Sequence, residues 1–159
     1  MDVDGVLTDG TVSLDEASHE SKRISFTDVM GISLARQAGL ELALISGEGG
    51  PLFDVIASKL GITDTYPHCR DKAAALQAFA LRRGLEVAEL CYVGDDVNDI
   101  PAMQICGLAV APADAHPSVR AVAAFVTSRA GGLGCVRELV DRLLDGQPGE
   151  TGGMHWAPR

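Results

Sequence analysis

Short apolar runs alternate along this chain with segments whose apolar residues recur at helical spacing. The run at 41–46, ELALIS, ends in Ser46-Gly47, as a buried strand followed by a loop does. The run at 89–96, ELCYVGDD, has an apolar centre and ends in aspartates, which indicates a strand that leads into a polar edge. Further short strands are predicted at 107–112 and 124–128.

Three segments between and after these runs predict helices. Residues 51–61 open with a proline and close with a glycine, and residues 71–84 open with an aspartate and close with basic residues and a glycine. Residues 134–146 place their apolar side chains on one helical face. Strands that alternate with helices of this length predict an α/β fold, a doubly wound, mostly parallel sheet with helices on both faces.

Two segments depart from this alternation. Residues 11–28 have an alternating pattern with a polar middle, which predicts a β-hairpin, a small flap at about 10–25 that projects from the sheet. Residues 146–159 are rich in glycine and proline. We therefore expect one domain over 1–145 and a flexible tail over 146–159.

Charge and cysteine usage narrow the function classes. A net charge of −9 argues against nucleic acid or an anionic membrane as the main partner. This net charge is compatible with a small anionic substrate, because a bound cation can make the local charge at a site positive. The cysteines form no CxxC pair, which favours reduced thiols in a cytoplasmic protein over a disulfide framework or a zinc site. No membrane span or signal-peptide pattern is present in the sequence.

Polar residues gather where the predicted strands end. Asp2 and Asp4 stand two apart at the start of the chain, Ser46-Gly47-Glu48 follows one strand, and Asp95 follows another. Ligands of open α/β sheets bind beyond the carboxyl ends of the strands. We expect these residues to share one site.

The pair Asp2 and Asp4 suits a division of labour. Residues two apart in an extended segment project to the same side, so one carboxylate can act as nucleophile and the other as general acid and base. The alternative is an ordinary Asp-Gly turn at 4–5, and the pair by itself does not decide between these interpretations.

The stretch GDDVND (94–99) favours a Mg²⁺ site. Asp95 is the expected direct ligand, and Asn98 and Asp99 are placed to orient water or a neighbouring ligand. A helix N-terminus needs only one capping aspartate, so capping alone does not account for three. The Ser46 hydroxyl, the Gly47 amide and Lys72 suit phosphate oxygens, although an ordinary loop and a solvated lysine remain open alternatives.

These motifs carry a resemblance to a known family. DVDGVLTDG (2–10), ISG (45–47), DK (71–72) and GDDVND (94–99), in this order, resemble the four motifs of the haloacid dehalogenase superfamily. GLAVAPADAHPSV, FVTSRAGGLGCVREL and MGISLARQAGL resemble its small branch without a cap domain. That branch contains 3-deoxy-D-manno-octulosonate (KDO) 8-phosphate phosphatases, KDN 9-phosphate phosphatases and the C-terminal domain of CMP-sialic acid synthetases. The resemblance runs from residue 2 to about 145.

The resemblance implies a role for each motif residue. Asp2 attacks phosphorus, and Asp4 protonates the leaving alcohol and then activates water. Mg²⁺ is held by the Asp2 side chain, the Asp4 carbonyl and Asp95, and Ser46 and Lys72 hold the phosphate. It also implies a homotetramer in which hairpins pack together and neighbouring subunits complete the site.

The residues that depart from the branch bear on the substrate. Glu48 stands where octulosonate phosphatases usually have arginine, and Glu48 with Lys59 matches a pair found in nonulosonate 9-phosphate phosphatases, although Lys59 could equally be a solvated helix residue. Leu133 stands where the branch often has another arginine. We therefore expect a phosphatase of 2-keto-3-deoxy sugar acid phosphates in sialic acid or KDO biosynthesis, with KDN or N-acetylneuraminate 9-phosphate ahead of KDO 8-phosphate. The rival interpretation is a non-catalytic tetramerisation domain associated with a cytidylyltransferase, and the intact motif residues count against it.

Only Met1 precedes the predicted nucleophile. A central parallel strand carries several apolar residues before its catalytic end. We expect the first strand to be truncated and the domain to be less stable than its relatives.

Overall fold

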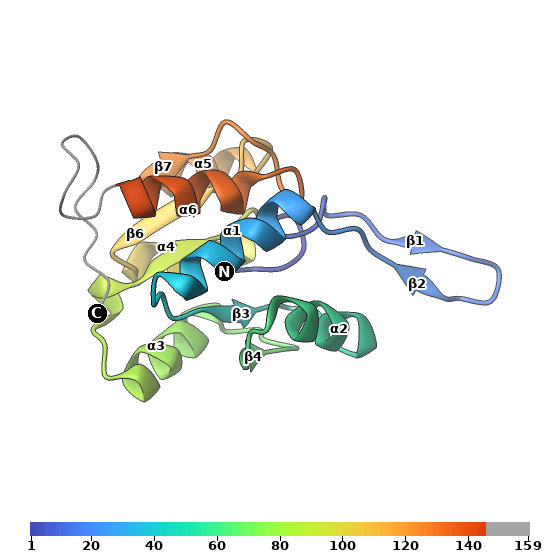
Figure 1. The fold of residues 1–159 in the computed structure, drawn as a ribbon, viewed down its shortest axis with the longest axis horizontal. Coiled ribbons are helices and arrows are strands. Elements are labelled where there is room, and N and C mark those ends of the chain that lie inside the picture. Colours follow the sequence, from blue (N-terminus) through green and yellow to red (C-terminus); the bar gives the residue numbers. More distant parts are fainter. Residues whose placement is uncertain (146–159) are drawn as a thin grey trace.

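The computed structural model describes residues 1–145 and shows an α/β fold with parallel strands between two layers of helices (Figure 1). The tail predicted at 146–159 lies outside these residues. The strands are β1 (Ser13–Leu14), β2 (Glu20–Ser21), β3 (Ala43–Ile45), β4 (Asp64–Tyr66), β5 (Cys91–Val93), β6 (Leu108–Ala111) and β7 (Phe125–Val126). The helices are α1 (Phe26–Gln37), α2 (Pro51–Leu60), α3 (Lys72–Arg83), α4 (Ile100–Ile105), α5 (Pro117–Val122) and α6 (Cys135–Asp145), with 3-10 turns at Val87–Glu89 and Val97–Asp99.

The start of the chain joins two groups of parallel strands. Strand β3 pairs with β4, and β6 pairs with both β5 and β7. Met1 lies beside β3, where its ammonium group donates to the Ala43 carbonyl (3.0 Å) and its carbonyl accepts from the Ile45 amide (2.9 Å). The Asp2 amide donates to the carbonyl of Val93 in β5 (2.9 Å). Residues 1–2 therefore occupy the middle of a mostly parallel layer, as the predicted fold requires.

The backbone at the start of the chain makes these contacts without an assigned strand. Behind Met1, an apolar cavity of about 130 Å³ lies between β3 and β5, with Leu42, Cys91 and Val93 among its lining residues. The lower stability expected of this domain stays a prediction.

Two apolar clusters cover the two faces of the strands. In β6, Leu108 and Val110 face a cluster that also contains residues of α1, α2 and α6. Their neighbours Ala109 and Ala111 face the opposite cluster, formed with residues of α3, α4 and α5. This alternation buries a strand on both sides and confirms the predicted helices on both faces.

The three predicted helices lie where the sequence placed them, as α2, α3 and α6. Asp71 caps α3 by accepting from the Ala74 amide (2.9 Å). Gly61 and Gly84 end α2 and α3 in the left-handed conformation, with φ of 64° and 65°. Glycine adopts this backbone conformation without the clash that a Cβ introduces, so these sequence signals end the helices for a physical reason.

The predicted hairpin is present as β1 and β2, whose antiparallel pairing joins Ser13 to Ser21 and Leu14 to Glu20. It extends away from the body of the molecule (Figure 1). Residues 10–21 are all exposed. Among residues 1–145, no helix combines the length and apolar character needed to cross a membrane.

Candidate active site

The predicted polar residues meet at the carboxyl ends of the central strands. Asp2 follows Met1, which lies beside β3, and its own amide bonds to β5. Ser46 follows β3, and Asp95 follows β5 after one intervening glycine. Together they border a cavity of about 250 Å³. The lining residues are Asp2, Asp4, Gly10, Ser46, Gly47, Glu48, Asp95, Asp96 and Asn98.

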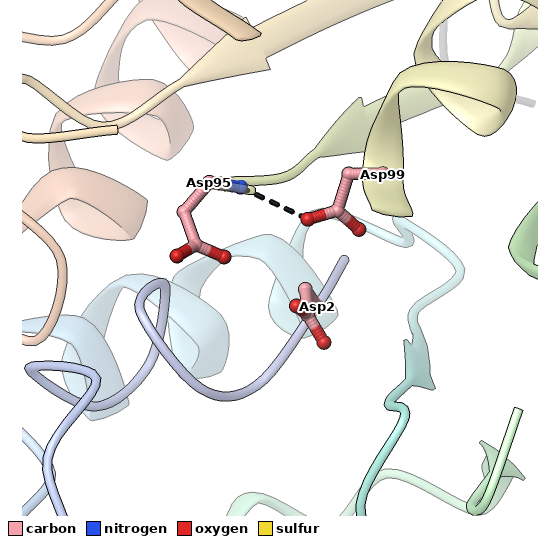
Figure 2. Close-up of side chains that lie close together, drawn as sticks. All are labelled: Asp2, Asp95 and Asp99. Atoms are coloured by element: carbon pink, nitrogen blue, oxygen red, sulfur yellow. Dashed lines mark hydrogen bonds between the residues drawn. The ribbon is translucent and has the colours of Figure 1, made fainter. Parts of the chain in front are cut away.

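Three carboxylates lie close together at this site, and two of them, Asp2 and Asp95, line the cavity. Asp2, Asp95 and Asp99 each offer an oxygen within 4.8 Å of the other two (Figure 2). Burial and the nearby Asp99 carboxylate raise the pKa of Asp2 to about 6, with the Lys72 ammonium opposing them. Burial and the carboxylates of Asp2 and Asp99 raise the pKa of Asp95 to about 7. Ionising the whole trio therefore costs free energy, which an additional cation offsets.

Asp99 differs from Asp2 and Asp95 because its oxygens accept four hydrogen bonds and it does not line the cavity. Oδ1 accepts from the Lys72 ammonium and the Tyr92 hydroxyl, each at 2.7 Å. Oδ2 accepts from the amides of Asp95 (3.0 Å) and Asp96 (3.3 Å). Figure 2 shows the bond from the Asp95 amide. Asp99 thus fixes the loop that carries Asp95, in keeping with the indirect role proposed for it.

The ammonium group of Lys72 lies between two carboxylates. Its Nζ is 2.7 Å from Asp2 Oδ2 and 2.7 Å from Asp99 Oδ1, and its side chain is 1% exposed. Burial favours a lower pKa for Lys72, but the charges of Asp2 and Asp99 outweigh burial and raise that pKa above its usual value. Lys72 is not among the lining residues of the cavity. The structure therefore places it against the predicted nucleophile, and the phosphate contact that the sequence suggested stays a proposal.

Asp4 lies at the cavity wall with both oxygens engaged. The Lys22 ammonium is 2.8 Å from Oδ2, and the Thr8 hydroxyl donates to Oδ1 at 3.1 Å. Asp2 accepts from the Val3 amide at 2.8 Å, so the two aspartates face different partners. No sequence pattern distinguishes Lys22, because it is one polar residue in a polar hairpin.

The loop after β3 forms another part of the wall. Ser46 is buried, and its hydroxyl oxygen accepts from the Glu48 amide at 3.1 Å. Gly47 and Asn98 are adjacent in the cavity lining, because a Cβ on Gly47 would lie 3.9 Å from Asn98 Nδ2. Asn98 is therefore a lining residue of the cavity, and the indirect role expected of it stays a prediction.

The two residues proposed to select the substrate are not brought together in this chain. Glu48 lines the cavity, whereas Lys59 lies in α2 with its Nζ 5.2 Å from the centroid of the Phe26 ring. Lys59 is exposed and is not a lining residue. The alternative that treated Lys59 as a solvated helix residue agrees better with its position, because the cation packs over an exposed aromatic ring.

A glycine is needed where the chain passes Asp95. Gly5 has φ of +80°, and a Cβ built there would overlap the Asp95 carboxylate. The Asp-Gly pair at 4–5 is therefore a turn as well as part of the site. The turn brings Asp4 and Asp95 to the same cavity, so it is compatible with the catalytic interpretation of Asp4, which stays a prediction.

The donor set fits a hard divalent cation. Asp2 and Asp95 are carboxylates at the cavity wall, and Mg²⁺ prefers a few oxygen ligands with space for water and phosphate. A cation there also relieves the repulsion that raises the pKa of both groups. Asp99 is unsuited to direct coordination because it does not line the cavity and its two oxygens already accept four hydrogen bonds.

Comparison with known proteins agrees with this geometry. The family model described as haloacid dehalogenase-like hydrolase matches residues 8–137. The 3-deoxy-D-manno-octulosonate 8-phosphate phosphatase KdsC of Escherichia coli strain K12 is 39% identical over 144 residues, which cover 91% of this chain and 77% of that protein.

Solved structures show the same similarity. The 3-deoxy-D-manno-octulosonate 8-phosphate phosphatase from Moraxella catarrhalis, in complex with magnesium ion, phosphate ion and KDO, matches with a TM-score of 0.87 and 32% identity. The match covers 91% of this chain and 83% of that one. A haloacid dehalogenase superfamily (subfamily III A) structure from Legionella pneumophila matches with a TM-score of 0.86 and 41% identity, covering 88% of this chain and 77% of that one. The chain therefore belongs to the haloacid dehalogenase-like hydrolases.

Proposed function

We propose that this protein is a Mg²⁺-dependent phosphatase that hydrolyses the phosphate monoester of a 2-keto-3-deoxy sugar acid through an aspartyl-phosphate. The observation that carries the proposal is the paired arrangement of Asp2 and Asp4 at one cavity, with the Lys72 ammonium 2.7 Å from Asp2 Oδ2. Phosphoryl transfer needs a positioned nucleophile and compensation for the charge of the phosphate. Asp95 and Asp2 would hold Mg²⁺, which when bound supplies further charge compensation.

In the first step, a carboxylate oxygen of Asp2 attacks phosphorus. A bond forms between this oxygen and phosphorus while the bond from phosphorus to the sugar oxygen breaks. The leaving sugar oxygen takes the proton of the Asp4 carboxyl group, so the products are the sugar acid and phosphorylated Asp2. Ser46 and the Gly47 amide border the space for the other phosphate oxygens.

In the second step, water attacks the phosphorus of phosphorylated Asp2 and gives a proton to Asp4. The bond between phosphorus and the Asp2 oxygen breaks, which releases inorganic phosphate and restores both side chains to their starting states. Lys72 stays beside the Asp2 oxygen and stabilises the carboxylate that leaves.

We favour KDO 8-phosphate as the substrate. The relatives described above are named for the octulosonate, whereas the case for a nonulosonate relied on Glu48 and Lys59 acting together. Since Lys59 packs over Phe26 outside the cavity, Glu48 alone remains to support that case. The relatives therefore support the octulosonate alternative better than the nonulosonate preference.

The test is phosphate release from KDO 8-phosphate, KDN 9-phosphate and a wider panel of sugar phosphates, with Mg²⁺ or with EDTA. We expect Mg²⁺-dependent release, fastest from KDO 8-phosphate, and none from the Asp2→Asn variant. Absence of release from the whole panel would contradict the proposed activity. Faster turnover of KDN 9-phosphate would contradict only the substrate.

We also propose that the protein is a homotetramer in which the hairpins pack together. Apolar side chains are exposed on the hairpin and on α1, and these are Val12, Leu14, Phe26 and Met30. Such side chains suit a contact between subunits. Sedimentation equilibrium tests this, and a Leu14→Glu variant that sediments like the unchanged chain would argue against hairpin contacts.

A further inference from the structure

We propose that Lys22 is a positioning residue that holds the Asp4 carboxyl group in place for proton transfer. The inference depends on the proposed function, because it takes Asp4 as the general acid and base. It adds a residue of the hairpin to the machinery of the site within a single chain. The hairpin itself lies outside the body of the fold (Figure 1).

The burial of Lys22 sets it apart from its neighbours in the hairpin segment. Residues 10–21 and Arg23 are exposed, whereas the Lys22 side chain is only 14% exposed. An ammonium group loses hydration when it is buried, so it needs a compensating partner. The Asp4 carboxylate, 2.8 Å from Lys22 Nζ, is that partner.

The Asp4 carboxyl group is held from two sides. Thr8 is fully buried, and its oxygen accepts from the amides of Gly5 (3.4 Å) and Gly10 (3.3 Å). Its single hydroxyl hydrogen is therefore free to point to Asp4 Oδ1, 3.1 Å away. Lys22 donates to the other oxygen, Oδ2. Together the two donors fix the plane of the carboxyl group, and Lys22 is the charged one.

Lys22 acts through Asp4, because it is not among the residues that line the cavity. Loss of its ammonium leaves Asp4 held at Oδ1 by Thr8, and the carboxyl group can then turn away from the leaving oxygen. Proton transfer from a positioned acid contributes roughly 10²–10⁴-fold to rate, so mispositioning is expected to cost a part of this, about 10- to 100-fold. The loss depends on how much the leaving group needs a proton.

The next residue along the chain provides a matched control. Arg23 also pairs with an aspartate of the same N-terminal segment, since its Nη2 is 2.8 Å from Asp9 Oδ2. Its side chain is 89% exposed, and Asp9 is not a lining residue. Arg23→Met therefore removes one hairpin cation and one ion pair without touching Asp4.

The experiment compares Lys22→Met, Lys22→Gln, Lys22→Arg and Arg23→Met with the unchanged protein. The measured quantity is kcat/KM with Mg²⁺, first on the best sugar phosphate and then on p-nitrophenyl phosphate. The sugar alkoxide needs a proton to leave, whereas p-nitrophenolate leaves without one. For the first two variants we expect a loss of about 10- to 100-fold on the sugar phosphate and less than about threefold on the aryl phosphate. Lys22→Arg is expected to restore most of the activity, and Arg23→Met to behave like the unchanged protein.

Equal losses on both substrates would overturn the inference, because they would indicate a general structural role. No loss on either substrate would overturn it as well. Circular dichroism shows whether each variant folds, and Lys22→Gln provides the measurement if Lys22→Met does not fold.

Asp4→Asn separates this inference from the proposed function. If Asp4→Asn loses activity on the sugar phosphate and the Lys22 variants do not, only the role of Lys22 fails. If Asp4→Asn keeps full activity, the acid and base assignment fails and the role of Lys22 fails with it. In the Asp4→Asn background, Lys22→Met is expected to cause no further loss, since the group on which it acts is gone.

Discussion

Asp95→Asn removes one charge from the carboxylate trio while keeping the shape of the side chain. Burial and the neighbouring carboxylates raise the pKa of Asp95 from 3.8 to about 7. At about 1.36 kcal/mol per pKa unit, that rise means that the ionised Asp95 carboxylate lowers the unfolding free energy by about 4 kcal/mol. Asp95 is partly exposed, so solvent screening reduces the figure to about 2 kcal/mol. We expect Asp95→Asn to be more stable than the unchanged protein by about 2 kcal/mol at pH 8 without metal.

The sign follows from where the protons bind. Between the unfolded pKa of 3.8 and the folded pKa of about 7, the native Asp95 binds more protons than the unfolded one. The unfolding free energy therefore falls as pH rises through this window. The advantage of Asp95→Asn is thus expected to be smaller at pH 5 than at pH 8.

Urea unfolding at pH 8 and pH 5, in EDTA and in Mg²⁺, measures these differences. Mg²⁺ is expected to stabilise the unchanged protein at pH 8 and to have little effect on Asp95→Asn. The exposed Asp54 provides an Asp54→Asn control for the loss of a charge outside the site. The reasoning is refuted if Asp95→Asn is no more stable than the unchanged protein at pH 8 in EDTA, or if Mg²⁺ stabilises both equally.

Four further changes test individual contacts. Tyr92→Phe removes a hydroxyl that donates to a buried carboxylate and is expected to lower the unfolding free energy by about 1 kcal/mol in urea. Tyr66→Phe, whose hydroxyl has no hydrogen-bond partner within residues 1–145, should cost nothing, and an equal loss would contradict this account. Gly5→Ala displaces the Asp95 carboxylate, so calorimetric titration with Mg²⁺ should show at least about tenfold weaker binding, and unchanged affinity would argue against a metal at Asp95. Glu48→Arg replaces an acidic cavity residue with one that pairs with a substrate carboxylate, so kcat/KM should move toward KDO 8-phosphate, and an unmoved preference would exclude Glu48 from selection.

The sequence predicted those elements whose apolar pattern and caps agree, and it missed those without such a pattern. Helix α1 buries Asp28 and Gly31 while it exposes Phe26 and Met30, so its sequence shows no apolar stripe. Asp28 is buried because it accepts from the amides of Gly134 and Arg137, a contact that no local pattern reveals. Helices α4 and α5 have 6 residues each, too few to establish a period.

The site residues that follow the ends of strands could be predicted from the sequence. Asp2, Ser46 and Asp95 meet because the carboxyl ends of parallel strands lie at one edge. Lys22 and Tyr92 reach the site through tertiary contacts, from a hairpin and from inside β5, and neither belongs to a recognisable motif. Spacing along the chain could not show these contacts. For the same reason, spacing could not show that Lys59 packs over Phe26 while Glu48 lines the cavity.

The central claim is that Asp2 and Asp4 hydrolyse a sugar acid phosphate with the help of a divalent cation. The most direct measurement is the rate of phosphate release from KDO 8-phosphate by the 159-residue chain, with and without Mg²⁺. We predict release that requires Mg²⁺ and disappears in Asp2→Asn. Release that persists in Asp2→Asn, or no release with Mg²⁺ present, would contradict the account.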